Sequence, residues 1–77
     1  MRWYVGQYTL HLDKERITLE VIIKAHSLKE AKGLLERWCT VAKETDNLNR
    51  EPLGIYEVKT LEDLSKFASL YITIGEL

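Results

Sequence analysis

The chain has 77 residues, of which 45% are hydrophobic and 30% charged, and 11 lysines and arginines against 12 aspartates and glutamates leave a formal net charge of −1. This length provides material for one hydrophobic core, so we expect a single domain spanning residues 1–77. The composition argues against a disordered chain, and the near-neutral charge argues against general nucleic-acid binding.

Cysteine content and the amino terminus indicate the compartment. Cys39 is the only cysteine, so no disulfide can form within the chain, and a reducing environment fits best. The first residues lack the continuous apolar stretch of a signal peptide. The longest aliphatic run, residues 21–23, is far shorter than the roughly 20 residues needed to cross a bilayer. We therefore expect a cytoplasmic protein that does not bind membranes.

Two β-strands joined by a hairpin are predicted at the start of the chain. Residues 3–12 are bulky and β-prone, and one alternating set contains Tyr4, Tyr8, Leu10 and Leu12, with Gly6 between them. Residues 13–16 form a polar interruption of the length that closes a hairpin. Every second residue of 17–25 is apolar, which is the period of a half-buried strand, and the opposite face is polar except for Ile22.

A long helix follows. Ser27 and Glu30 form a capping box, which predicts the helix start. Apolar residues then recur at three- and four-residue steps and form one stripe that a sheet should cover. The members of this stripe are Leu28, Ala31, Leu34, Leu35, Trp38, Val41 and Ala42.

The last third of the chain is predicted to contain a loop, two strands and a short helix. Residues 46–52 combine helix-stopping residues with a proline, which predicts the longest loop. Residues 54–59 follow as a third strand, with Tyr56 and Val58 pointing inward. Thr60 with Asp63 begins a short second helix over residues 60–68, and alternation over residues 70–75 predicts a final strand.

The predicted fold class is α+β, with the order β-β-α-β-α-β. The simplest solution is a mixed four-stranded sheet with one long and one short helix packed on one face. The long helix allows a right-handed parallel crossover between the second and third strands, and the sheet order beyond the hairpin stays open. Residues 25–31 resemble the strand-to-helix junction of several small bacterial α+β proteins, HicB-type antitoxins among them, but this general helix-capping pattern implies no function or site residues.

Catalytic and metal chemistry have little support. Cys39 lies at the edge of the helical stripe, where a cysteine is usually a small buried hydrophobe. Ser27 already serves as a helix cap, and His26 lies where the strand turns into the helix. His11 with Asp13 and Glu15 would suit a divalent metal, but these residues are also typical of a solvated turn.

No spacing of the four glycines fits a phosphate-binding loop. We therefore predict that the chain is not an enzyme and has no catalytic, metal-binding or cofactor-binding residues.

One surface is predicted to bind a partner. If the helices cover one sheet face, the residues on the other face are unusually apolar, and such patches often mark association surfaces. These residues are Trp3, Val5, Ile22, Ile55 and Tyr71. The alternative is a few scattered exposed apolar side chains, which are normal.

The predicted function is a small, non-catalytic protein–protein interaction module whose partner is another protein. We expect a homodimer formed through this face or through the edge of the first or the last strand. The small size suggests an inhibitor or adaptor, encoded by a mobile element, that acts on a larger host protein assembly. The alternative is a small nucleic-acid or nucleotide-binding protein that stacks bases on Trp3 and Tyr71.

Overall fold

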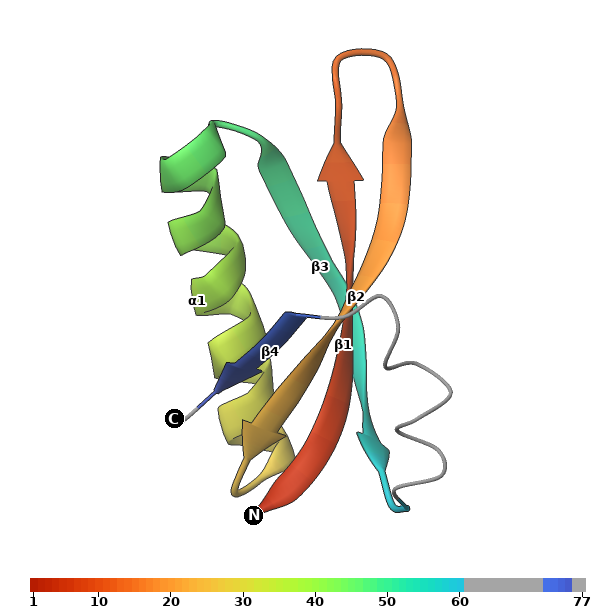
Figure 1. Cartoon of the computed structure of the whole chain (residues 1–77), viewed down its shortest axis with the longest axis vertical. Helices are drawn as coiled ribbons and strands as arrows, with labels where there is room; N and C mark the ends of the chain where they lie inside the picture. The colour runs from red at the N-terminus through yellow and green to blue at the C-terminus, as the bar shows by residue number, and fades with distance from the viewer. Residues whose placement is uncertain (61–71, 76–77) are drawn as a thin grey trace.

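The computed structural model describes residues 1–60 and, for the backbone alone, residues 72–75. Its elements in chain order are β1 (Arg2–His11), β2 (Arg16–Ala25), α1 (Leu28–Asp46), β3 (Asn49–Val58) and β4 (Ile72–Gly75). Neighbouring strands lie in the order β3-β1-β2-β4. β2, β1 and β3 form an antiparallel sheet, the short β4 lies beside β2, and α1 packs against one face of the sheet (Figure 1).

The first two strands form the predicted hairpin. They pair antiparallel without interruption from Arg2 opposite Ala25 to His11 opposite Arg16. The backbone N–H of Leu12 donates to the carbonyl of Glu15 at 2.8 Å and closes the turn. The four-residue loop is confirmed, and it begins one residue earlier than predicted.

The core lies between α1 and the sheet. The period of two places one set of alternate strand residues under the helix, where it meets three buried residues of α1. The sheet contributes Tyr4, Tyr8, Val21, Ile23 and Ala25, and the helix contributes Ala31, Leu35 and Cys39. A Cβ atom at Gly6 would lie 2.9 Å from Cδ1 of Ile23 and 3.1 Å from Cδ1 of Leu35, so the absence of a side chain allows this close packing.

Both ends of α1 are capped. The backbone N–H of Glu30 donates to Oγ of Ser27 at 3.1 Å, which confirms the predicted helix start. At the other end Asn47 adopts the left-handed conformation with φ 60°, and its N–H donates to the carbonyl of Lys43 at 2.7 Å. The helix therefore ends sharply and passes almost directly into β3.

The predicted loop over residues 46–52 is wrong, because β3 begins at Asn49 and contains Pro52. In the described part of the chain β3 has a neighbour, β1, on one side only, so the N–H that Pro52 lacks need not weaken a second ladder. The pairing with β1 also shifts register between Gln7 and Tyr8, opposite Pro52 and Gly54, which lets the strand continue past this irregular segment.

The predicted fold class is also wrong. The structure supports a three-stranded antiparallel sheet, β2-β1-β3, with one helix in the order β-β-α-β, and not a four-stranded mixed sheet with two helices. β1 lies between β2 and β3, so the chain crosses β1 through α1, in a sheet order that the sequence left open. β4 adds only four residues, parallel to β2. The second helix predicted over residues 60–68 falls largely outside the described residues.

The apolar pattern of a strand specifies which face is buried but not which strand lies beside it, so the sequence could not give the sheet order. The position of β1 also changes one functional expectation. Because β1 has a neighbour on both sides, its edge is not available for the dimer contact predicted there.

Candidate interaction surface

Two of the predicted contact residues, Val5 and Ile22, lie directly opposite each other on the sheet face that points away from α1. Their exposed fractions are only 0% and 6%. A partner therefore gains almost no contact area from either side chain, although both lie on the face where the sequence places them.

Trp3 is half-buried on the same face, opposite Lys24. The ammonium group of Lys24 lies 5.4 Å from the centroid of the Trp3 ring, which is a cation–π distance. Lys24 thus already contacts one face of the indole ring that was predicted to bind a partner or to stack on a base.

Ile55 lies on the other face, because it pairs with Gly6 and packs against the core under α1. Tyr56 points away from α1 instead, opposite Val5, with 38% of its surface exposed. The orientation predicted for Tyr56 and Val58 is therefore reversed. Apolar residues on both faces of β3 make its orientation ambiguous from sequence. Tyr71 lies outside the described residues.

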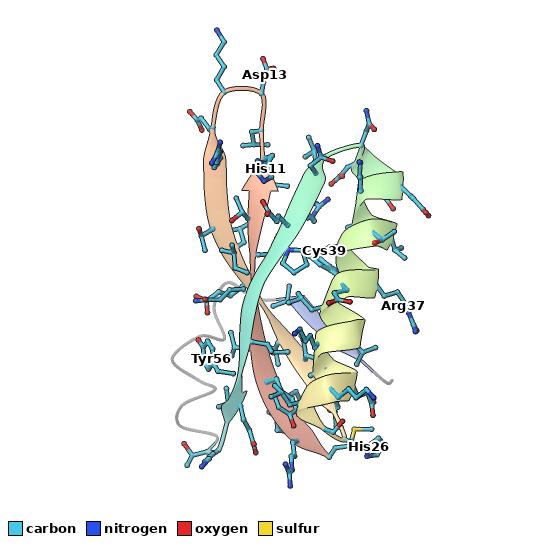
Figure 2. The ribbon with its side chains drawn as sticks, turned by 180° about the vertical axis from the view of Figure 1, so that it is seen from behind. His11, Asp13, His26, Arg37, Cys39 and Tyr56 are labelled. Atoms are coloured by element: carbon cyan, nitrogen blue, oxygen red, sulfur yellow. The ribbon has the colours of Figure 1, made fainter. Side chains whose placement is uncertain are left out.

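Tyr56 links β3 to β2 across the central strand. Its hydroxyl donates to Oε2 of Glu20 at 3.0 Å. Burial, together with the hydrogen bond and charge of Glu20, raises the pKa of Tyr56 to about 12, so the phenol stays protonated at neutral pH. Figure 2 shows Tyr56 pointing away from the sheet on the side opposite the helix.

A more accessible apolar surface lies on the α1 side of the sheet, where β1 and β2 extend toward the hairpin loop. We call residues 8–20 the distal hairpin. Here Ile17 lies opposite Leu10 and Leu19 lies opposite Tyr8. Ile17 and Leu19 are 37% and 36% exposed, although they continue the same alternating set as the fully buried Val21.

The course of α1 explains this exposure. The carboxyl-terminal half of α1 runs beside β3, and the first half of β2 is separated from β3 by β1 (Figure 1). The helix therefore covers the second half of β2 and leaves Ile17 and Leu19 without a covering element among the described residues.

A cluster around Arg50 holds α1 in this position. Its guanidinium donates to both carboxylate oxygens of Asp46, at 2.9 and 2.6 Å, and lies 5.5 Å from the centroid of the Trp38 ring. Trp38 in turn meets Tyr8 edge to face, with 4.9 Å between the ring centroids. The hydrogen bond from Arg50 lowers the pKa of Asp46 to about 2. Sequence reasoning missed this cluster because its members come from three separate elements.

The outer edge of the distal hairpin also has no partner strand over residues 16–20 in the described part of the chain. β4 pairs with β2 only from Val21 to Lys24. No described strand pairs with the outer side of residues 16–20, so their outward N–H and C=O groups can take another strand.

The residues weighed for catalysis or metal binding do not come together. Figure 2 shows Asp13 at the tip of the hairpin, Cys39 between helix and sheet, and His26 at the opposite end of the molecule. Nε2 of His11 lies 3.3 Å from Oε2 of Glu51, and within the described residues no group of three histidine, cysteine or acidic residues could hold a metal ion.

Cys39 is buried, which confirms its predicted place as a small core residue. Burial raises the pKa of its thiol and so reduces the fraction of reactive thiolate.

The chain matches no protein-family model, no curated protein and no solved structure. In the part of the chain that the structure describes, no helix is both long and apolar enough to span a membrane.

Proposed function

We propose that this chain is a small, non-catalytic protein-binding module that uses the distal hairpin as its contact surface. The observation that carries the proposal is the coincidence of two features at one place. Among the described residues no strand pairs with the outer side of residues 16–20, and Ile17 and Leu19 are exposed beside it.

These two features suit the addition of a strand from another protein. In that mode the main-chain hydrogen bonds provide affinity, and alternate side chains provide specificity. Ile17 and Leu19 alternate on one face of β2, so the side chains of a strand added at this edge would pack beside both of them.

Affinity capture from cells that express the tagged full chain tests this proposal. We expect Leu19→Lys to lose a protein partner that the wild type retains, because the charge would lie against the apolar side chains of the added strand. Val41→Lys is the matched control, since Val41 is an exposed aliphatic residue on α1, away from β2. Circular dichroism establishes that both variants are folded.

The same partners recovered with Leu19→Lys and Val41→Lys would overturn the proposal. Recovery of RNA or DNA, with loss of binding at high salt, would favour the nucleic-acid alternative instead. A second copy of this chain counts as a protein partner when tagged and untagged chains are expressed together.

Within this proposal, a role as an inhibitor or adaptor of a larger assembly is the natural use of a small module that adds one strand to another protein. The lone buried Cys39 supports a reducing, cytoplasmic setting for that role. A large complex captured by the wild type and lost with Leu19→Lys would support it.

A further inference from the structure

The edge of β2 at residues 16–20 differs from the other exposed edge of the sheet. β3 carries a proline, a glycine and a register shift, which are features that hinder the addition of another strand. Residues 16–20 contain none of these features and pair with β1 in regular register. The β2 edge is therefore the better template for strand addition.

This edge is also complementary to itself. If two copies of β2 run antiparallel with Thr18 opposite Thr18, Arg16 of each copy lies opposite Glu20 of the other. Ile17 then lies opposite Leu19. Opposite charges, apolar pairs and threonine pairs are the combinations that stabilise neighbouring strands.

We propose that a second copy of this chain occupies the β2 edge, in an antiparallel ladder centred on Thr18. This inference rests on the proposed use of the distal hairpin for protein binding. It gives a closed, twofold-symmetric contact in which the same five residues serve on both sides.

The neighbouring strand restricts the register of this ladder. Moving it one step toward the carboxyl end would place Ile22 opposite Arg16, but Ile22 already pairs with Thr73 of β4. Moving it one step toward the amino end would place Glu20 opposite Lys14, which belongs to the hairpin loop and not to β2. The Thr18-centred register pairs all five residues, 16–20, whose outer side no described strand occupies.

The charged groups are available for this pairing. Arg16 is exposed and Glu20 is half-buried. Tyr56 donates to Oε2 of Glu20, and within the described residues no hydrogen bond occupies Oε1, so this oxygen can accept from Arg16 of the second copy.

The twofold axis places the two α1 helices on the same side of the joined sheet, where Ile17 and Leu19 of both copies form one apolar strip.

Sedimentation of the full chain at a series of concentrations provides the first test. Because the ladder is only five residues long, we expect a reversible dimer with a Kd on the order of micromolar to tens of micromolar. A wild-type chain that stays monomeric at millimolar concentration would overturn the inference.

Charge reversal tests the register. Arg16→Glu places like charges opposite each other twice per dimer, and so does Glu20→Arg, so we expect each variant to weaken dimerisation by about tenfold or more. An equimolar mixture of the two variants restores opposite charges at both positions and should dimerise like the wild type. Lys14→Glu, a charge reversal in the exposed loop, is the matched control and should leave the dimer intact.

Thr18→Cys provides a readout that does not disturb the edge. Since position 18 faces itself across the axis, mild oxidation should give a covalent dimer, whereas Thr40→Cys on the exposed side of α1 should stay monomeric. If neither charge reversal changes the Kd of the dimer and this disulfide does not form, the contact lies elsewhere and the inference is overturned.

Failure of this inference is distinguishable from failure of the proposed function. If the wild type is monomeric but Leu19→Lys still loses a different protein in the capture experiment, the distal hairpin binds that protein and not a second copy. If neither experiment depends on the distal hairpin, both proposals fail.

Discussion

Gly6 shows how one residue controls the distance between α1 and the sheet. A Cβ atom there would come within 2.9 Å of Ile23 and 3.1 Å of Leu35, two buried side chains on opposite sides of the core. At Gly54, also in a strand, an added Cβ would meet nothing within 4 Å. Substitution of these two glycines by alanine therefore compares an added methyl group in the packed core with one that contacts nothing.

We expect Gly6→Ala to reduce the free energy of unfolding by about 1 kcal/mol, because a methyl group added to a packed core forces its neighbours to move. This value lies at the low end for overpacking, since the atoms in contact are the mobile ends of side chains. Gly54→Ala should be neutral or slightly stabilising, because it only restricts the unfolded chain. Urea unfolding of both variants measures the difference, and equal effects would show that α1 does not approach Gly6 closely.

At the scale of the elements, the hairpin and α1 were predictable because each has a strong local signal. Alternation over residues 17–25 and the capping box at Ser27 depend only on neighbours in the sequence. β3 was predicted only from residue 54 onward. Pro52 usually marks a loop, and only the position of β3 beside β1, with a register shift, accommodates it in a strand.

The junction between α1 and β3 gives a prediction for acid stability. The pKa of Asp46 falls from its ordinary value of 3.8 to about 2 in the folded chain, chiefly through its hydrogen bond with Arg50. Ionised Asp46 therefore favours folding, and its contribution is complete above about pH 4 and is lost as the pH falls toward 2. We expect Asp46→Asn to be less stable than the wild type at neutral pH and equally stable below about pH 2.

Denaturant unfolding at several pH values measures this convergence. The asparagine keeps Oδ1 as an acceptor for the N–H of Leu48, so the variant removes the charge and retains that contact. Asp13→Asn, in the exposed hairpin loop, is the control. A stability difference for Asp46→Asn that persists unchanged from pH 7 to pH 2 would contradict the assigned role of the Arg50 ion pair.

At the scale of the whole molecule, the sequence predicted an excess of apolar side chains but not where they would be accessible. Ile17 and Val21 belong to the same alternating set, yet one is 37% exposed and the other is fully buried. The difference depends on where α1 crosses the sheet, and the contacts among Arg50, Asp46 and Trp38 help to fix that crossing. These contacts join residues from separate elements, so no local pattern reveals them.

The single thiol of Cys39 reports on the integrity of the whole fold. It lies between α1 and the sheet, and burial raises its pKa, so a thiol reagent can modify it only when the structure opens. At about 0.05–0.15 kcal/mol per residue, 77 residues correspond to about 4–12 kcal/mol, which predicts labelling at least about 10³-fold slower than in urea. Labelling as fast as in urea would mean that α1 does not stay packed on the sheet.

The same measurement connects folding to association, because a contact that only the folded chain can make stabilises the folded state by mass action. Under the Thr18-centred ladder, labelling of wild-type Cys39 should slow as the protein concentration rises through the Kd. Labelling of Arg16→Glu should stay independent of concentration over that range, since this variant keeps the core and weakens only the contact. Equal concentration dependence in both chains would show that association, where it occurs, does not use the β2 edge.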